Sequence, residues 1–181
     1  MKRLGVFCGS RTGGPPIFAE QTRVLGEAMV RRGLGLVFGA GHIGLMGVLA
    51  DAVRAQGGET VGVIPRALVE RELAHQQLSA LHVVESMHDR KALMAELADG
   101  FLALPGGFGT LDELFEILTW AQLKFHGKPI GLLNTAGFYD PLLAWIERAI
   151  ADDFVKLKNR GLLMVEADVE PLLDRLTTVA G

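Results

Sequence analysis

A glycine-rich turn is the part of this chain best suited to chemistry. Residues 105–110 read PGGFGT, directly after the continuous apolar run Phe101–Leu104, which predicts a buried strand. From Thr110 onward the apolar residues recur at helical spacing, so a helix is expected to begin there. Glycines let the backbone come close to a ligand, and the free N–H groups of a helix start attract anions. We therefore expect this turn to bind the phosphate of a nucleotide.

Two other interpretations of the turn are open. No lysine follows the glycines, so the turn does not have the pattern of an NTPase phosphate loop. Thr110 and Glu113 have the spacing of a capping box, in which both side chains would bond only to the start of their own helix. Gly106, Gly107 and Gly109 together exceed what a helix cap requires, and this favours the phosphate site.

A charged stretch, MHDRK at residues 87–91, opens another predicted helix. Ser86 and Asp89 have the spacing of a capping pair. Arg90 and Lys91 follow in the first turns, where the helix dipole disfavours cations. Two cations in that place indicate an anion to meet, and a solvated charged face is the alternative. We expect Arg90 to lie in the same cleft as the glycine turn.

The segment GAGHIG at residues 39–44 matches the dinucleotide pattern G-x-G-x-x-G between a strand and a helix. The acid that binds the ribose normally lies at the carboxyl end of the next strand, whereas Glu59 precedes that strand. The position of Glu59 therefore argues against NAD as the ligand of this motif. Close packing of strand against helix remains open, and a backbone wall for a mononucleotide is the interpretation that we prefer.

Apolar runs alternate with amphipathic segments along the whole chain. The runs expected to form strands are Leu4–Cys8, Leu34–Phe38, Thr60–Ile64, Leu81–Val84, Phe101–Leu104, Pro129–Leu133 and Leu162–Val165. Helices are predicted between them, and the polar residues 66–80 form either a short helix or an active-site loop. This alternation predicts an α/β fold over residues 1–181: a single Rossmann-like domain with a doubly wound parallel sheet and helices on both faces. Ligands bind beyond the carboxyl ends of such strands, so the turns after Gly9, Phe38, Ile64 and Leu104 should line one cleft.

Composition limits the classes of partner. The chain has 181 residues, 49% of them hydrophobic, and a net charge of −3, which gives no bulk attraction to nucleic acid or to an anionic membrane. Cys8 is the only cysteine and the five histidines lack metal-ligand spacing, so we expect no disulfide and no metal. The N-terminus reads as a strand rather than a signal peptide, and the apolar runs are too short to span a bilayer. A cytoplasmic protein is therefore expected.

Together these motifs resemble those of the LONELY GUY (LOG) family, whose members were long mislabelled lysine decarboxylases. The segments MHDRK, PGGFGTLDE, ILTWAQL and KPIGLLN carry the resemblance, which extends from CGS near the N-terminus to the helix after GFYDP. The resemblance implies a homodimer that needs no cofactor. It also implies a phosphoribohydrolase that cleaves the N-glycosidic bond of a nucleoside 5′-monophosphate, either AMP or a cytokinin riboside monophosphate, and releases the base and ribose 5-phosphate.

The resemblance also assigns roles to individual residues. It implies that Arg90 and Glu113 are catalytic, with Glu113 stabilising an oxocarbenium-like sugar and Arg90 holding phosphate or ribose oxygens. The residues that it implies for substrate binding are Glu72, Lys91, Gly107, Phe108, Gly109, Thr110, Leu111, Asp112 and Thr119. Three positions depart from the family pattern, namely Ala40, Phe108 and Asp112, and none belongs to the catalytic pair.

Two other functions fit the same fold. A nucleotide or cofactor carrier would need the glycine turn but not both Arg90 and Glu113. A true lysine decarboxylase would need pyridoxal phosphate on a lysine, and no lysine here has a recognisable setting for it.

Overall fold

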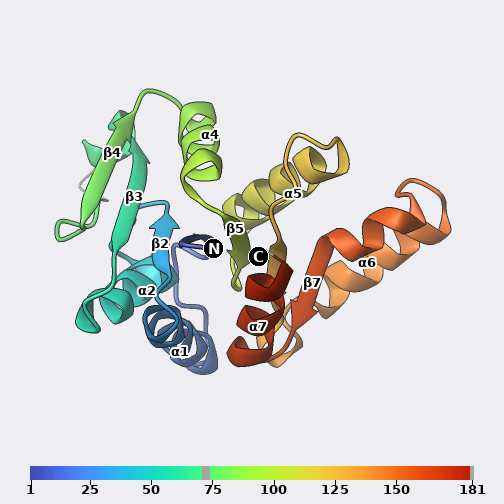
Figure 1. The fold of residues 1–181 in the computed structure, drawn as a ribbon, viewed down its shortest axis with the longest axis horizontal. Helices are drawn as coiled ribbons and strands as arrows, with labels where there is room; N and C mark the ends of the chain where they lie inside the picture. Colours follow the sequence, from blue (N-terminus) through green and yellow to red (C-terminus); the bar gives the residue numbers. More distant parts are fainter. Residues whose placement is uncertain (71–73, 180–181) are drawn as a thin grey trace.

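The computed structural model describes residues 1–70 and 74–179, which form one parallel sheet between two layers of helices (Figure 1). The strands of this described part are β1 (Arg3–Phe7), β2 (Gly35–Phe38), β3 (Thr60–Pro65), β4 (Ala80–Val84), β5 (Gly100–Ala103), β6 (Ile130–Leu133) and β7 (Leu163–Glu166). All seven predicted strands are present, and no boundary differs from the prediction by more than one residue. The predicted α/β fold with a doubly wound parallel sheet is confirmed.

Helices connect the strands and cover both faces of the sheet. They are α1 (Ile17–Arg31), α2 (Gly44–Ala55), α3 (Arg66–Val69), α4 (Met87–Leu97), α5 (Phe108–Gln122), α6 (Asp140–Ala151) and α7 (Val169–Val179), with short 3₁₀ turns η1 (Thr135–Gly137) and η2 (Leu157–Leu162). In Figure 1, α4 and α5 lie above the sheet, and α1, α2 and α7 lie below it. No helix in the described part of the chain has both the length and the apolarity needed to cross a membrane.

The strand residues alternate between two buried layers. On one face, Leu4 and Leu36 pack with side chains of α1, α2 and α7, and on the other, Phe7 and Phe101 pack with side chains of α4 and α5. Because both faces are buried, the inner strands read as continuous apolar runs rather than as alternating ones. The edge strand β4 is different, since most of its side chains are exposed or half-buried.

The order of the strands places a crevice beside β1. The order is β4-β3-β2-β1-β5-β6-β7, so the chain first builds outward from β1 on one side and then returns to β5 on the other. The loops that follow β1 and β5 leave the sheet in opposite directions at this reversal, which is where ligands bind in such folds. Gly9 N donates to Pro105 O across the two loops at 3.1 Å. The glycine turn therefore lies at the switch point of the sheet.

Gly26 of α1 allows α1 and α2 to pack closely against each other. A Cβ at this position would lie 2.7 Å from the Cβ of Ala52 and 3.3 Å from the main-chain oxygen of Leu49. We expect Gly26→Ala to lower the free energy of unfolding by about 1–3 kcal/mol, because the overpacking outweighs the better helix propensity of alanine. Urea unfolding would measure this. Gly161→Ala, where a Cβ meets open space, is the control and should change little; an equal or higher midpoint for Gly26→Ala would contradict the prediction.

Candidate active site

A buried ion pair joins α4 to α5 at the carboxyl ends of the strands. Arg90 Nη1 donates to Glu113 Oε1 at 2.6 Å, and the two side chains are only 10% and 9% exposed. Arg90 Nε also donates to the main-chain oxygen of Val63 at 3.2 Å, near the end of β3. The guanidinium is thus fixed from two directions. The two residues expected to be catalytic come together, although 23 positions separate them in sequence.

Burial and charge act on Glu113 in opposite directions. Removal from water raises the pKa of the Glu113 carboxyl above its ordinary value, and the nearby Arg90 guanidinium offsets part of that rise. Cys8 lies near this pair, and burial raises the pKa of its thiol so far that the group stays neutral at physiological pH. The site therefore holds one carboxylate with a strengthened affinity for protons and no thiolate.

A cavity of about 330 Å³ opens in front of the ion pair. Besides Arg90 and Glu113, its lining comes from the ends of three strands and the segments that follow them: Val6, Cys8, Gly9, Ser10, Gly39, Met46, Gly107, Phe108, Gly109 and Thr110. The volume is of the size expected for a pocket that binds a small molecule, roughly 300–1,000 Å³. The turns after β1, β2 and β5 meet here as predicted. No described residue of the turn after Ile64 lines the cavity, so that part of the prediction is wrong for the part of the chain that the structure describes. β3 instead contributes the Val63 carbonyl, which accepts from Arg90.

The start of α5 corrects the expectation for Thr110. The helix begins at Phe108 rather than Thr110, its N-cap is Gly107, and no side chain caps it. The capping-box interpretation is therefore wrong, because Thr110 lies inside the helix and Glu113 bonds to Arg90. Gly106 makes this start possible, since a Cβ there would lie 2.0 Å from the Thr110 hydroxyl oxygen. The first N–H groups of α5 thus have no side-chain partner at the edge of the cavity.

The start of α4 is closed in the way that the sequence predicts. Asp89 N donates to Ser86 Oγ at 3.0 Å, and Ser86 N donates to Asp89 Oδ2 at 3.1 Å, which completes a capping box. Arg90 follows in the first turn, where the dipole disfavours a cation. The Glu113 carboxylate compensates for this position. The anion that the sequence indicated is therefore, in the free protein, a carboxylate of α5.

The turn that carries the GAGHIG motif supports the guanidinium from behind. A Cβ at Gly39 would lie 1.9 Å from Arg90 Nη2, so only glycine lets the turn approach this closely. Gly44 has a φ of +65°, and a Cβ there would lie 2.2 Å from the carbonyl carbon of Ser10. Ala40, which departs from the family pattern, also has a positive φ, of 59°. Close packing and a wall of the cavity therefore both describe this motif.

The other residues expected to bind substrate divide into two groups. Gly107, Phe108, Gly109 and Thr110 line the cavity, and Phe108 is 96% exposed at its mouth. Leu111, Asp112, Lys91 and Thr119 are not part of this lining. Glu72 lies outside the described residues.

Lys91 and Thr119 make contacts of their own. Lys91 Nζ lies 3.1 Å from carboxylate oxygens of both Asp112 and Glu116, so it forms a second ionic link between α4 and α5. Thr119 Oγ1 donates to the main-chain oxygen of Phe115 at 2.7 Å and lines a separate groove between α5 and α6. Neither residue reaches the Arg90–Glu113 cavity within this one chain, and their substrate-binding roles stay predictions.

The sequence interpretation missed three residues of the lining. Val6 and Cys8 stand at the end of β1 and could have been found from their place at the switch point of the sheet. Met46 follows the GAGHIG motif in the first turn of α2, and nothing in its spacing distinguishes it from a core residue.

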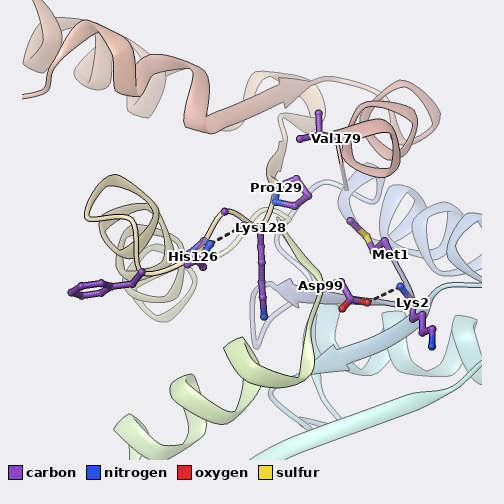
Figure 2. A pocket seen from close by; sticks show the side chains of 9 residues that line it. Met1, Lys2, Asp99, His126, Lys128, Pro129 and Val179 are labelled. Carbon is purple, nitrogen blue, oxygen red and sulfur yellow. Dashed lines mark hydrogen bonds between the residues drawn. The ribbon is translucent and has the colours of Figure 1, made fainter. Parts of the chain in front are cut away.

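Another cavity, of about 830 Å³, lies at the opposite end of the sheet (Figure 2). Two of its charged side chains are bonded within the protein: Lys128 Nζ donates to the main-chain oxygens of Ala95 and Ala98 at 2.7 Å, and Asp99 accepts from Lys2 N at 2.6 Å. His126 Nδ1 accepts from Lys128 N at 3.1 Å. The smaller cavity with the Arg90–Glu113 pair is therefore the better candidate for chemistry.

Comparison with known proteins finds relatives in both sequence and structure. A family model described as "Possible lysine decarboxylase" matches residues 46–176. A probable cytokinin riboside 5′-monophosphate phosphoribohydrolase, LOGL5 of Oryza sativa subsp. japonica, is 46% identical over 97% of this chain and 71% of its own length. The cytokinin riboside 5′-monophosphate phosphoribohydrolase LOG7 of Arabidopsis thaliana is 43% identical over 97% of this chain and 81% of its own. Among solved structures, the molybdenum cofactor binding protein from Rippkaea orientalis has a TM-score of 0.75 at 19% identity, over 99% of this chain and 97% of its own, which is a likeness of fold.

Two glycines of the turn allow the anion site to be tested apart from the fold. A Cβ at Gly109 meets open space at the second residue of α5, so Gly109→Ala should keep or raise stability, by up to about 1 kcal/mol, while the methyl group obstructs a bound phosphate. We expect the affinity for AMP, measured by calorimetry, to fall about tenfold or more. Gly106→Ala should instead lower the unfolding midpoint, because its Cβ would collide with Thr110. Unchanged AMP affinity in Gly109→Ala would contradict a phosphate at this turn.

Proposed function

This chain belongs to the family of cytokinin riboside 5′-monophosphate phosphoribohydrolases, and we propose that it hydrolyses the N-glycosidic bond of a nucleoside 5′-monophosphate, either AMP or an N6-substituted cytokinin relative. The products are the free base and ribose 5-phosphate. The observation that carries the proposal is the buried Arg90–Glu113 pair facing the uncapped start of α5 in one cavity. Relatives with the phosphoribohydrolase name and 43–46% identity over nearly the whole chain support it.

Substrate binding begins with the phosphate. The uncapped N–H groups at Gly107–Thr110 and the positive end of the helix dipole suit a dianion. Gly107 and Gly109 leave space beside the backbone, since a Cβ at either position has no neighbour within 4 Å. The phosphate does not react, so its binding energy can serve to hold the ribose at the catalytic pair. This accounts for a preference for the monophosphate over the free riboside.

The bond-breaking step needs a negative charge beside the sugar. As the bond between ribose C1′ and the base nitrogen breaks, positive charge develops on the ribose ring, and the Glu113 carboxylate stabilises it. Glu113 then accepts a proton from the water whose oxygen bonds to C1′. The departing base takes up one proton from solvent, and Glu113 returns its proton to solvent, so that one water is consumed for each bond broken. Burial raises the pKa of the Glu113 carboxyl, which makes its carboxylate a better base, while Arg90 offsets part of that rise and aligns the carboxylate.

Two competing functions share parts of this site. A carrier would bind the nucleotide at the turn without turnover, and the 19% likeness to a molybdenum cofactor binding protein reaches no further than the fold. A decarboxylase would need a lysine free to hold pyridoxal phosphate. No lysine among the described residues lines the cavity, and Lys91 is paired with Asp112 and Glu116.

We also propose that the protein works as a homodimer through a groove between α5 and α6. The groove, of about 270 Å³, is walled by Phe115, Leu118, Trp145 and Phe154, and Phe154 is 87% exposed in the single chain. Apolar surface of this kind is typical of an interface. Thr119 lies in the groove, six residues and so about 9 Å along the helix from Glu113. A second copy seated there would bring its own cavity toward Thr119.

The catalytic assignment predicts a separation of binding from turnover. Glu113→Gln keeps the size of the side chain but not its charge, so we expect kcat for release of adenine from AMP to fall about 100-fold or more, because general-base and electrostatic assistance are both lost. AMP affinity should stay within about fivefold of the wild type. Chromatography for free adenine and calorimetry would measure the two quantities. Glu96→Gln, an exposed carboxylate on α4, is the matched control and should keep full activity.

The pH dependence gives a second readout of Glu113. Because burial raises its pKa, the carboxyl gains a proton at a higher pH than an ordinary glutamate, so kcat should fall with decreasing pH through a midpoint above 4.5. An adenine-releasing protein whose acid limb lies at or below that value would remove Glu113 from the role of base. Wild-type protein that binds AMP but releases no adenine would instead favour the carrier.

The homodimer predicts a loss of assembly on one face only. We expect Trp145→Glu to convert a dimer to a monomer in size-exclusion chromatography with light scattering, because a charge would be buried in the apolar groove. Activity should fall with it if Thr119 serves the neighbouring cavity. Val24→Glu places the same charge on an exposed position of α1 and should leave the assembly intact. A dimer that survives Trp145→Glu would place the interface elsewhere.

A further inference from the structure

Segment 74–79, which precedes β4, is tied to α2 and β3 by side-chain hydrogen bonds, and we call it the strap. His75 Nε2 lies 3.1 Å from Asp51 Oδ1, and Arg54 Nη2 donates to Gln77 Oε1 at 2.5 Å. Ser79 and Thr60 exchange hydrogen bonds of 3.0 and 3.1 Å between main chain and hydroxyl, which fix the end of the strap to β3. None of these contacts belongs to the catalytic cavity.

The hydrogen bonds of His75 define the form of its ring. Gln77 N donates to His75 Nδ1 at 3.3 Å, so Nδ1 carries no proton. The ring proton is therefore on Nε2, and His75 donates it to the Asp51 carboxylate. The imidazole is only 8% exposed, whereas the Asp51 side chain is 66% exposed. Because the ring is buried and both of its nitrogens are hydrogen-bonded, His75 is held in one orientation and fixes the strap to α2.

The strap in turn holds the turn after β2. His75 N donates to Ala40 O at 2.7 Å, and Ala74 forms an isolated antiparallel bridge with Gly41. Ala40 has a φ of 59°, a conformation that is unfavourable for a non-glycine residue and needs support from its surroundings. The strap supplies that support at the strained residue and at the residue that follows it.

The turn after β2 is in direct contact with the catalytic arginine. A Cβ at Gly39 would lie 1.9 Å from Arg90 Nη2, so the guanidinium rests against the backbone of Gly39. The other two sides of the guanidinium are held by the Val63 carbonyl and by Glu113. If the turn moves, the guanidinium loses its contact with Gly39, which is one of the three contacts that hold it.

We propose that His75 is a positioning residue for Arg90: its imidazole anchors the strap to α2, and the strap holds the turn at Gly39–Gly41 against the guanidinium. The catalytic consequence rests on the proposed phosphoribohydrolase function, because it assumes that the orientation of Arg90 matters for turnover. The geometric part does not depend on that function. Whatever the reaction, the imidazole determines where the turn lies and therefore how the guanidinium is held.

The first test separates positioning from general stability. In His75→Ala, assayed well below its melting temperature, we expect kcat with AMP to fall about tenfold while KM changes less than threefold. In His75→Gln, whose amide can still donate to Asp51, most of this loss should be recovered. His82→Ala, an exposed histidine on β4, is the matched control and should behave as wild type. A His75→Ala protein that melts earlier but keeps its kcat would show a purely structural role and overturn the proposal.

A second variant and a double mutant extend the test. Asp51→Ala removes the exposed partner of the anchor and should fold readily; we expect a smaller loss of kcat in the same direction. In an Arg90→Lys background, His75→Ala should add little further loss, because both changes act through the same contact. If the fold-losses of kcat in the two single variants multiply in the double variant, His75 does not act through Arg90.

The third readout needs no activity. The Arg90 Nε–H group, bonded to Val63 O, should give a resolved signal in a ¹⁵N–¹H spectrum, assigned by its absence in Arg90→Lys. We expect His75→Ala to shift or broaden this signal and His82→Ala to leave it unchanged. If wild-type protein releases no adenine and the signal still responds, the proposed function fails while the positioning role holds. An unchanged signal in His75→Ala would overturn the positioning role whatever the activity.

Discussion

A guanidinium and a carboxylate removed from water each lose several kcal/mol of hydration, and this cost constrains the whole region around Arg90 and Glu113. The pair exists only because α4 and α5 bring the two charges within 2.6 Å of each other above the carboxyl ends of the strands. Lys91, with Asp112 and Glu116, repeats the connection nearer the surface. The packing of α4 against α5 therefore depends on the ion pairs between the two helices.

The two helices start in different ways, and the difference has a chemical meaning. The capping box of Ser86 and Asp89 satisfies the start of α4 internally, so that helix can present Arg90 from a fixed position. The start of α5 has a glycine at its N-cap and no side-chain partner, which leaves its N–H groups for a ligand. The capped start of α4 thus positions the cation, while the start of α5 keeps N–H groups without a side-chain partner.

The fold by itself does not specify the chemistry. A structure with 19% identity and a TM-score of 0.75 shares the same arrangement of strands and helices and has a cofactor-binding name. A sheet with a switch point provides a crevice for many ligands. The groups in that crevice are more specific than the fold: a carboxylate with a raised pKa, a fixed guanidinium and a helix start without a side-chain cap line one cavity.

Local patterns in the sequence were sufficient to predict the strands of this protein and the start of α4. The apolar runs determined all seven strands to within one residue, because burial on both faces leaves a continuous hydrophobic signal. The capping pair Ser86–Asp89 was also readable, since its partners are three residues apart and bond within one helix turn. Only the tertiary structure decided the partner of Glu113. The spacing between Thr110 and Glu113 also fitted a capping box. The actual partner of Glu113 is Arg90, which lies 23 residues away in sequence. The contact of Gly39 with that arginine and the anchoring of the strap by His75 were likewise decided by packing, because contacts between distant segments leave no periodic trace in the sequence.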